Sequence, residues 1–468
     1  MALQSAIGVL SELRQIVGDA SLRLDAVSLQ TYGVDALGKG HPPDVVVIPA
    51  NTEQIASIAR LCNSARVPLV VRGAGTGFTG GAVPTCGGVL LSMERLNRIL
   101  DIDELNLLAV VEPNVINADL QNAVEKLGLF YPPDPASLNQ SSIGGNVAEC
   151  AGGPRAFKYG TTKRYVLALE AVLPTGEIIQ TGSKAVKNVV GYDLTQLLVG
   201  SEGTLAIITK ITVRLLPKPP ASATMLATFA GVRNAVDAVS ELIRRRVVPA
   251  ALELIDSDAL KAIEANLGGG LVPPDTGAAL IVEVDGTGRG VQEDLDRVVE
   301  ACRSMDAKEI SRARDEAERD RIWSLRRQTS VALKATGLIK INHDVVVPKG
   351  RVPELFDVIA EMKQAYALRV AAFGHAGDGN IHVNLLITPG DANEAARAKE
   401  AERFLFTRVV ALEGSISGEH GIGFAKAAYL PIELSSDQIA LMKRVKAAFD
   451  PNGILNPGKI FPNDSIST

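Results

Sequence analysis

Histidine is scarce in this chain, and the few histidines are not evenly scattered. Of five among 468 residues, His375 and His382 lie in "AAFGHAGDGNIHVNLLI", and His420 lies in "SGEHGIG" directly after Glu419. Imidazole is the commonest metal ligand and the side chain that titrates nearest to neutral pH. A lone histidine is more often a satisfied structural residue, but this clustering favours a metal site or proton-transfer chemistry.

Two short strands must present the first pair of histidines. The apolar runs 371–373 and 381–387 are predicted strands, and the glycines between them turn the chain. Because side chains alternate along a strand, His382 and Asn384 leave the same face. His375, at the turn, can fold back beside them.

A carboxylate would complete a two-His-one-carboxylate set of the kind that holds a divalent transition metal with open positions. Glu419 is the candidate, because its neighbouring glycines allow the loop to approach closely. His420 would then point elsewhere, toward a molecule held at the metal.

The run "VRGAGTGFTGGAVP" has five glycines in the nine positions from Gly73 to Gly81 and follows the apolar stretch Pro68–Val71. A dinucleotide-binding fingerprint needs a helix directly after such glycines, but here Pro84 and two further glycines precede another strand, Val89–Leu91. No GK[ST] follows either. The run is therefore a tight loop between strands, or a nest of backbone N–H groups that binds phosphate without a helix.

Two later runs favour the phosphate-binding alternative. They are "SSIGGNVAECAGG", Ser141–Gly153, and "GSEGTLAIIT", Gly200–Thr209. Three such loops, each fed by a strand, could line one extended ligand. Further phosphate donors would be Arg72 and the hydroxyls of Thr76, Thr79, Ser141 and Ser142.

Composition excludes several classes of function. The net charge of −5 and the absence of a basic run disfavour nucleic acid and anionic membranes as partners. No stretch has the 18 apolar residues of a membrane span, and the start of the chain lacks the basic region of a secretory signal. The four cysteines form no CxxC pair, which is typical of a reducing compartment. We expect a cytoplasmic protein.

The organisation of the chain changes at "LLPKPP", residues 215–220, whose prolines stop either kind of element. Before it we expect strands, a helix capped by Asn51 or Thr52, and a long glycine- and proline-rich loop over 131–160. Beyond it helical and extended segments alternate, which predicts an α+β domain of antiparallel strands with helices on one face.

Seven motifs together give the chain a family resemblance. They are "RGAGTGFTGGAVP", "PPDPASLNQSSIGGNVAECAGG", "KYGTT", "GYDLTQLLVGSEGTLAIIT", "GHAGDGNIHVN", "SGEHGIG" and "NGILNPGKI". In this order, and over nearly the whole chain, they resemble the FAD-linked D-2-hydroxy-acid dehydrogenases of the vanillyl-alcohol-oxidase flavoprotein superfamily. The resemblance implies an α+β fold: a two-lobed FAD-binding domain over 1–218, a substrate-capping domain with an antiparallel sheet over 219–413, and a segment over 414–468 that returns to the flavin.

The resemblance also implies which residues contact FAD. The first loop would embrace the pyrophosphate, the second would line the flavin and its ribityl chain, the third would contact the adenosine end, and "NPGK" would close the pocket. The residues are Arg72, Gly73, Ala74, Gly75, Thr76, Gly77, Thr79, Gly80 and Gly81; Pro133, Asp134, Ser137, Ser142, Gly144, Gly145, Asn146 and Ala148; Glu202, Gly203 and Ile208; and Asn456.

One departure from the pattern concerns how the flavin is held. Some relatives attach it covalently through a histidine in the first loop or a cysteine in the second. Thr76 stands at the histidine's position, and Cys150 is not at the attaching position. We therefore expect non-covalent FAD. Cys150 stands where relatives more often have asparagine, and nothing in the sequence explains it.

For the chemistry, the resemblance implies His375, His382 and Glu419 as ligands of a divalent metal, zinc or a manganese- or iron-like ion, and His420 as the base. The metal would lower the pKa of a 2-hydroxy acid's hydroxyl, His420 would take its proton, and the flavin would accept a hydride. Arg326 and Lys340 would bind the carboxylate, and Asn384 would face the same site. Arg327 and His343 receive no role.

The expected activity is oxidation of glycolate or D-lactate, with D-2-hydroxyglutarate as the alternative substrate. A non-redox FAD transferase of the same fold and a non-catalytic FAD-binding subunit are less favoured, because the histidines and Glu419 are intact. The chain has no iron–sulfur or haem motif, so electrons must pass to a quinone, a cytochrome or a partner flavin or iron–sulfur subunit, which would place the protein at the periphery of a membrane. The sequence leaves open whether the chain works with such subunits or as a homodimer.

Overall fold

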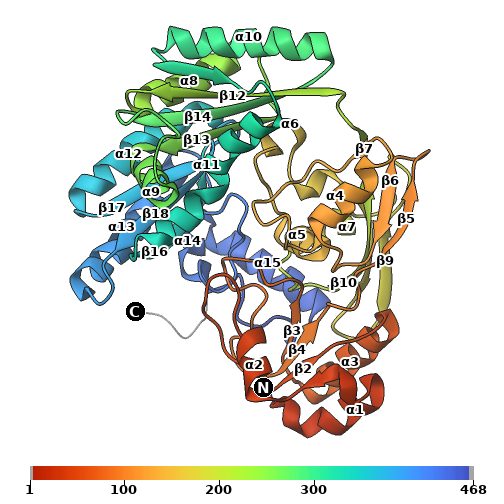
Figure 1. The fold of residues 1–468 in the computed structure, drawn as a ribbon. Coiled ribbons are helices and arrows are strands. Elements are labelled where there is room, and N and C mark those ends of the chain that lie inside the picture. Colours follow the sequence, from red (N-terminus) through yellow and green to blue (C-terminus); the bar gives the residue numbers. More distant parts are fainter. Residues whose placement is uncertain (1–3, 463–468) are drawn as a thin grey trace. The chain divides into compact units, whose positions relative to one another are not determined.

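Two units, each with its own core, make up the computed structural model, which describes residues 4–462 (Figure 1). The first takes the chain up to Gly152, then Thr161–Lys218, and then the part from Glu419 onward. The second takes Gly153–Gly160 and Pro219–Gly418. The predicted domains differ from these units in two places, because 153–160 and 414–418 belong to the second unit. Residues 1–3 and 463–468, which the predicted bounds include, lie outside the described part.

The first unit contains a small sheet of order β1-β2-β4-β3. Three of its strands are parallel, β2 (Val45–Val47), β4 (Val89–Ser92) and β3 (Leu69–Arg72), and β1 (Leu22–Arg23) runs antiparallel to β2. The helix α3 (Thr52–Ala65) is capped by Asn51, whose side chain accepts a hydrogen bond from the N–H of Gln54 at 2.9 Å. The predicted strands and the predicted helix cap are confirmed here.

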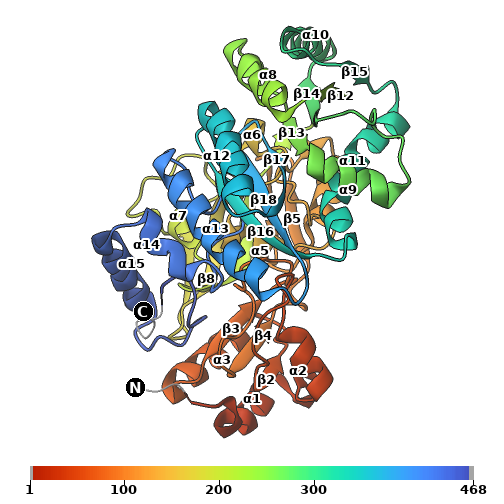
Figure 2. The same cartoon turned by 90° about the vertical axis from the view of Figure 1, so that its left-hand side faces the viewer.

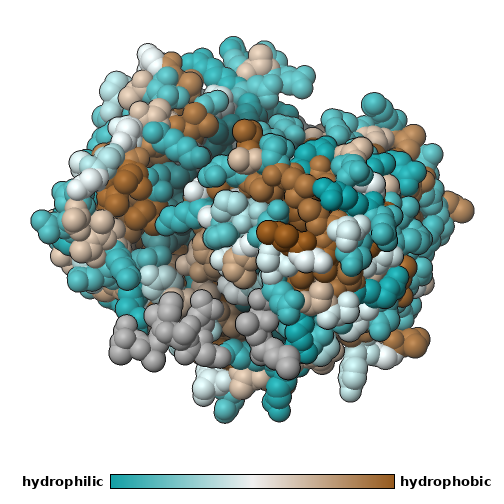
Figure 3. Space-filling view, turned by 90° about the horizontal axis from the view of Figure 1, so that it is seen from below, coloured by the Kyte–Doolittle hydropathy of each residue, from teal (hydrophilic) through white to brown (hydrophobic). Residues whose placement is uncertain are grey.

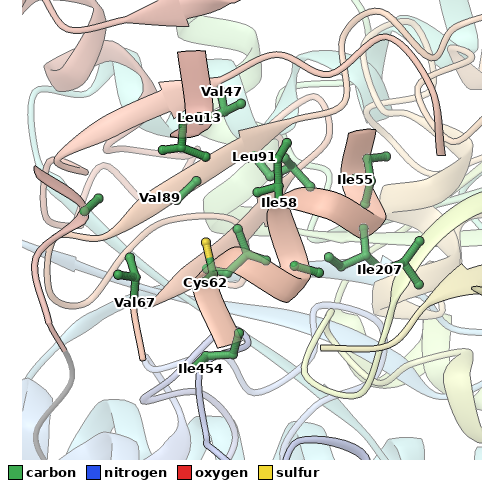
Figure 4. Close-up of a cluster of buried hydrophobic side chains, with 14 of the residues drawn as sticks. Leu13, Val47, Ile55, Ile58, Cys62, Val67, Val89, Leu91, Ile207 and Ile454 are labelled. Carbon is green, nitrogen blue, oxygen red and sulfur yellow. The ribbon is translucent and has the colours of Figure 1, made fainter. Parts of the chain in front are cut away.

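The core between α3 and this sheet follows from helical spacing. Ile55, Ile58 and Cys62 lie on one face of α3 and are fully buried. They pack with strand residues such as Val89 and Leu91 in a single cluster (Figure 4). This packing holds β3 and β4 in place, and the glycine loop connects those two strands.

A second sheet of the first unit is antiparallel, in the order β5-β6-β10-β8-β9. Its strands are β5 (Ile99–Asp103), β6 (Leu108–Val111), β10 (Ile207–Arg214), β8 (Val166–Val172) and β9 (Ile178–Gly182), and a two-stranded ladder joins β7 (Leu129–Phe130) to β11 (Leu216–Pro217). A turn at Pro174–Gly176 connects β8 and β9, which pair as an antiparallel hairpin.

Helices complete the first unit. They are α1 (Leu10–Val17), α2 (Ala26–Tyr32), α4 (Asn117–Glu125), α5 (Ile143–Glu149), α7 (Leu194–Leu198), α14 (Leu430–Glu433) and α15 (Ser436–Phe449), with short 3-10 turns η1 (Ala6–Val9), η2 (Asp19–Ser21), η3 (Thr162–Arg164) and η5 (Ala427–Tyr429).

Two expectations about the glycine-rich segments need correction. The stretch 131–160 is not one long loop, because Ser142 caps the short helix α5 by accepting a hydrogen bond from the N–H of Gly145, and α6 (Ala156–Tyr159) follows. The third glycine run is fed by the helix α7 rather than by a strand. The two glycines of α5 concealed this helix, since its cap and its buried packing outweigh the low helix propensity of glycine over a few residues.

The second unit is built on a seven-stranded sheet of order β15-β12-β14-β13-β17-β18-β16, antiparallel throughout. The strands are β12 (Ala221–Phe229), β13 (Ala251–Asp256), β14 (Ala278–Gly286), β15 (Glu309–Arg312), β16 (Ile339–Val346), β17 (Arg369–His375) and β18 (Asn380–Ile387). The predicted antiparallel sheet is confirmed.

Helices lie on both faces of this sheet, which corrects the expectation of helices on one face (Figure 2). One face contacts α8 (Val232–Arg244), α10 (Gly288–Ser304), α12 (Val352–Ala365) and α13 (Ala392–Ala411), with the turn η4 (Lys349–Arg351) before α12. The other face packs its apolar residues against α9 (Ser257–Leu267) and α11 (Glu316–Ala335).

The segment 153–160 belongs to the second unit because its side chains anchor on that sheet. Tyr159 Oη donates to Asp285 Oδ2 at 2.6 Å, and Lys158 Nζ donates to the carbonyl of Asp285 at 2.8 Å. A Cβ on Gly377 would lie 2.6 Å from the ring of Phe157, so this glycine is what allows the ring to pack there.

Figure 3 shows one face of the molecule coloured by hydropathy. Hydrophilic residues cover most of the face drawn in Figure 3, and hydrophobic residues lie in separate groups among them. Within residues 4–462, no helix has both the length and the hydropathy needed to cross a bilayer.

Candidate functional site

A pocket in the first unit is walled by the glycine loop, the start of α5, the turn after α7 and the Glu419–His420 segment. Most of the residues predicted to contact FAD line it: Gly73, Ala74, Gly75, Thr76, Gly77, Gly81, Ser137, Ser142, Gly144, Gly145, Asn146, Ala148, Glu202, Gly203 and Ile208. Segments far apart in the sequence therefore meet around one space, as the three glycine runs predict.

Glycine is needed where these walls approach one another. A Cβ on Gly144 would lie 2.8 Å from the carbonyl oxygen of Pro113, and a Cβ on Gly73 would lie 2.4 Å from Ser142 Oγ. The first contact would push α5 away from the segment that follows β6, and the second would push the glycine loop away from the residue that caps α5. Ser141, which also lines the pocket, has a buried hydroxyl with no hydrogen-bond partner among the described residues.

Six predicted FAD contacts do not line this pocket: Arg72, Thr79, Gly80, Pro133, Asp134 and Asn456. Arg72 donates instead to the carbonyl of Val34 at 2.8 Å, and Thr79 donates to the carbonyl of His420 at 3.0 Å. The expectation that these two donors face phosphate is not met. Both side chains donate hydrogen bonds to backbone carbonyl groups of loop residues.

Asn456 and Pro133 do not line the pocket, but both form hydrogen bonds with residues close to it. Asn456 Nδ2 donates to the carbonyls of Gly81 at 2.8 Å and Glu202 at 2.7 Å, so the "NPGK" segment ties the first and third glycine runs together. The carbonyl of Pro133 accepts hydrogen bonds from Asn117 and Gln121.

Glu202, a predicted FAD contact, belongs to a group of buried charges beside the pocket whose other members sequence reasoning missed. Lys459 is 3% exposed and donates to the carbonyls of Gly80 and Val83. Glu202 accepts hydrogen bonds from the N–H groups of Ile422 at 2.8 Å and Gly423 at 2.6 Å. Charged residues inside glycine-rich motifs were the available signal, since a buried charge needs a partner.

Burial controls the protonation of this group. It raises the pKa of Glu202, although the two N–H donors and Lys459 oppose that shift. It also lowers the pKa of Lys459 to about 8, against the opposing effect of Asp35 and the nearby glutamates.

Glu419 and His420 belong to the first unit and line its pocket. The carbonyl of His420 accepts a hydrogen bond from Thr79. The ring centroid of His420 lies 5.3 Å from the ring centroid of Phe78. A Cβ on Gly152 would lie 2.8 Å from Glu419 Oε2, so Gly152 leaves the room that this carboxylate occupies.

The second site lies on one face of the seven-stranded sheet. The strand register places Asp344 of β16 opposite His382 of β18, and Glu253 of β13 opposite His375 of β17. The strands β17 and β18 are themselves paired, with Phe373 opposite His382. Side chains alternate along strands, so one face carries Lys340, Asn342, Asp344, His382, Asn384, His375 and Glu253. The predicted common face of His382 and Asn384, with His375 beside them, is what the register produces.

Glu253 is the main residue that sequence reasoning missed. It is fully buried, its Oε1 lies 2.6 Å from His375 Nδ1, and its Oε2 accepts from Arg326 Nε at 2.5 Å. Burial opposes its ionisation, but His375 and Arg326 outweigh burial and lower the pKa of Glu253 to about 2. The signal was one charged residue in the apolar strand "AALELI".

Arg326 and Lys340 approach the same region from α11 and β16. Arg326 is 7% exposed, and its guanidinium carbon lies 4.9 Å from the ring centroid of Phe373. Lys340 Nζ donates to Ser330 Oγ at 2.6 Å. Burial, together with the positive charges of Lys334 and Arg326, lowers the pKa of Lys340 to about 8. Two neighbouring positive charges that are largely shielded from water can bind an anionic group such as a carboxylate.

The imidazoles of His375 and His382 lie 5.6 Å apart between centroids and nearly perpendicular, at 83°. Asn384 Nδ2 donates to the carbonyls of Ala371 and His382, and its buried Oδ1 has no hydrogen-bond partner in the described part of the chain. The amide is therefore fixed by its NH₂ end and presents an acceptor.

Asp344 binds Gly418, the last residue of the second unit. It accepts hydrogen bonds from the N–H of Gly418 at 3.0 Å and from Asn380 Nδ2 at 2.7 Å. Glu419 is the next residue along the chain. His343, which received no role, is buried with its ring packed edge-on against Phe406 at 5.3 Å and lies 3.6 Å from Glu402.

The two α+β units, the glycine-lined pocket and the sheet face with two histidines and an arginine define a flavoprotein of the class that the motifs indicate. Family models match an FAD binding domain over residues 43–182 and the C-terminal domain of FAD linked oxidases over residues 218–460. The chain belongs to the FAD-linked oxidases, in the group of glycolate oxidase subunit GlcD and D-lactate dehydrogenase, and it is an FAD-linked oxidoreductase.

Two relatives and one solved structure illustrate this membership. Glycolate oxidase subunit GlcD of Bacillus subtilis (strain 168) is 41% identical over 460 residues, covering 98% of this chain and 97% of the relative. D-lactate dehydrogenase of Anaerostipes hadrus is 36% identical over 427 residues, covering 89% of each chain. The structure of p-cresol methylhydroxylase with substrate bound shares the fold, with a TM-score of 0.81, 17% identity and coverage of 100% of this chain and 99% of that one.

The residues of the first unit fit FAD. The glycines leave a cradle that a Cβ at Gly73 or Gly144 would disturb, and Ser141 supplies a buried hydroxyl that needs a partner. Backbone N–H groups at such glycine turns bind phosphate.

Proposed function

We propose that this chain oxidises a small D-2-hydroxy acid, glycolate or D-lactate, to the 2-oxo acid. The observation that carries the proposal is the contact of Glu253 with both Arg326 and His375, which fixes a carboxylate-binding group and an imidazole on one buried face. The names of the relatives, glycolate oxidase subunit and D-lactate dehydrogenase, support the same substrate class.

Arg326 and Lys340 bind the substrate carboxylate in this proposal. Glu253 occupies Nε of Arg326, so the terminal nitrogens are the edge that a second carboxylate can use. The side chain of Asn384 is a neutral amide, and its Oδ1 can accept a hydrogen bond from the substrate hydroxyl.

His420 is proposed to take the proton of the substrate hydroxyl as general base. Thr79 positions the backbone of His420 by donating to its carbonyl. His420 lines the pocket in which FAD is proposed to bind non-covalently. Bound FAD supplies a hydride acceptor, which is the chemistry of the cofactor rather than of the protein.

His375, His382 and Glu419 are proposed to hold a divalent metal, zinc or a manganese- or iron-like ion. The donor set supports this, because a metal-binding histidine usually has its other ring nitrogen held by a carboxylate, as Glu253 holds Nδ1 of His375. A metal there would supply Lewis acidity that lowers the pKa of the substrate hydroxyl. Metal analysis of the purified protein and of Glu419→Gln tests the ligand set, and equal metal content in both contradicts it.

The substrate is tested by flavin bleaching without oxygen. Glycolate or D-lactate should bleach the absorbance of the bound flavin, and a chelator should suppress the response. Bleaching by D-2-hydroxyglutarate alone would select that alternative. Bleaching by none of the three acids would reject the dehydrogenase and favour the non-redox transferase.

Matched variants test the roles of Arg326 and His420. Arg326→Ala should raise KM about 10- to 100-fold, the loss expected for one charge-assisted pair. Its neighbour Arg327 is exposed and donates to the carbonyl of Asp320, so Arg327→Ala should leave KM unchanged. His420→Ala should keep FAD and slow bleaching about 100-fold or more. A normal rate would show that another group is the base.

Electrons are proposed to leave to a separate acceptor, a quinone, a cytochrome or a partner subunit. No iron–sulfur or haem motif is present in the sequence, and the GlcD relatives are named as subunits. Two experiments separate an obligatory complex from an independent homodimer. Co-purification identifies the binding partners of the chain. Reduction of an artificial dye by the chain alone would indicate a homodimer, and reduction only with its partners would indicate a complex.

A further inference from the structure

Glu149 is a titratable residue in the first unit that the proposed reaction does not use. It ends α5 and lines the glycine-walled pocket. Its Oε2 is completely buried and has no hydrogen-bond partner among the described residues. A buried polar oxygen without a partner is destabilising, so such an atom needs a ligand or a proton to explain it.

We propose that Glu149 is a protonated carboxylic acid that donates a hydrogen bond to the FAD bound in this pocket. The proposal rests on FAD binding by the first unit and not on the identity of the substrate. It adds a cofactor-contacting residue that neither the motifs nor the resemblance pointed to.

Two glycines place the carboxyl group at the pocket. A Cβ on Gly81 would lie 2.5 Å from Glu149 Oε1, and a Cβ on Gly421 would lie 2.4 Å from Glu149 Oε2. The carboxyl group therefore lies between the first glycine loop and the turn that follows His420. Only glycine at both positions leaves it room.

Burial and the neighbouring carboxyl groups favour the protonated form of Glu149. Glu202 lies close to it, because the same Cβ on Gly421 would also be 2.9 Å from Glu202 Oε1. Asp35 adds a third carboxyl, while Lys459 is the cation that acts on all three. Burial raises the pKa of Glu149 well above its usual value, Glu202 and Asp35 raise it further, and Lys459 opposes them.

The division of roles within this cluster follows from the hydrogen bonds. Glu202 accepts from two backbone N–H groups, at Ile422 and Gly423, which stabilise its ionised form. Oε2 of Glu149 has no such donor among the described residues. With one negative charge already at Glu202 beside a single lysine, the proton belongs on Glu149, and a protonated carboxyl is a donor.

Three variants distinguish a neutral donor from a charge. Glu149→Gln keeps a neutral donor of nearly the same shape, Glu149→Ala removes it, and Glu104→Gln changes an exposed glutamate as a control. FAD affinity of the apoprotein, measured by flavin fluorescence quenching at pH 7, should be unchanged within about twofold for Glu149→Gln and Glu104→Gln. It should be weaker by about tenfold for Glu149→Ala, the size of one lost hydrogen bond.

Two results would overturn the proposal. One is equal FAD affinity in wild type and Glu149→Ala, which would mean that the carboxyl does not contact the cofactor. The other is an equal loss in Glu149→Gln and Glu149→Ala, which would mean that the carboxylate charge is required. Substrate is absent from the assay, so an error in the proposed reaction does not affect the result.

A second readout covers the case in which Glu149→Ala does not fold. The absorbance spectrum of bound flavin in the wild type should shift as alkali removes the proton from Glu149, and the spectrum of Glu149→Gln should lack that transition. The same transition in both proteins would overturn the proposal.

Discussion

Oε2 of Glu253 lies 2.5 Å from Nε of Arg326 and is completely buried. The same carboxylate holds His375 through its other oxygen, at 2.6 Å. One residue of β13 therefore orients a guanidinium from α11 and an imidazole from β17, and the site depends on a carboxylate that touches neither FAD nor, in our proposal, the substrate.

Glu253→Gln should impair catalysis more than its distance from the substrate suggests. The amide keeps the shape but loses the charge that holds both partners, and changes of this kind typically cost about 10- to 100-fold. We expect that loss in kcat/KM with FAD content unchanged. Steady-state kinetics and the flavin absorbance of the same sample check it, and a variant with normal kinetics would separate Glu253 from the site.

Lys340 should make substrate affinity depend on alkaline pH. Its pKa is lowered to about 8 by burial and by the charges of Lys334 and Arg326. Above pH 8 the cation is lost, so KM for the hydroxy acid should rise with pH. Lys340→Met should show a high KM without this pH dependence, whereas a rise that persists in the variant would point to another group.

The same lysine also affects the stability of the fold. The folded-state pKa lies below the unfolded value, so the unfolded chain binds more protons between about pH 8 and pH 10.5. The contribution of Lys340 to stability is therefore least favourable below pH 8 and improves as pH rises through that window. Urea titrations of wild type and Lys340→Met at pH 7 and pH 9.5 should show the two proteins converging at the higher pH.

The backbone conformation at Cys150 favours asparagine. It closes α5 in the left-handed region, at φ 55° and ψ 47°, where asparagine is better tolerated than most residues. Cys150→Asn should stabilise the protein by about 0.3–1 kcal/mol in urea unfolding. Cys86→Ser, at an exposed cysteine without positive φ, is the control; a destabilised Cys150→Asn would show that the contact of Sγ with Thr161 Oγ1 matters more.

Non-covalent flavin binding is open to a direct test. Thr76 lines the pocket at the position where some relatives carry the attaching histidine, and threonine cannot form that bond. Acid precipitation should leave all the yellow colour in the supernatant. Flavin fluorescence that remains on the denatured protein in a gel would contradict this expectation.

Local patterns predicted much of the fold. Apolar runs marked β3 and β4, and the predicted cap at Asn51 or Thr52 marked the start of α3. The helix α5 escaped prediction because its glycines have low helix propensity, while the cap from Ser142 and burial against the neighbouring chain stabilise it. Helices on the second face of the large sheet escaped because periodicity identifies an apolar stripe but not the surface that it meets.

The sequence by itself determined the glycine loops, the common face of His382 and Asn384, and the absence of a nicotinamide fingerprint, because each depends on neighbours within a few residues. Only the tertiary structure decided that Glu253 meets His375, 122 residues away, that Arg72 and Thr79 brace backbone instead of facing the pocket, and that Glu149 lies with Glu202 and Lys459. Those outcomes depend on strand register and on burial. Both arise from the packing of distant segments, which also sets the charge of each buried group.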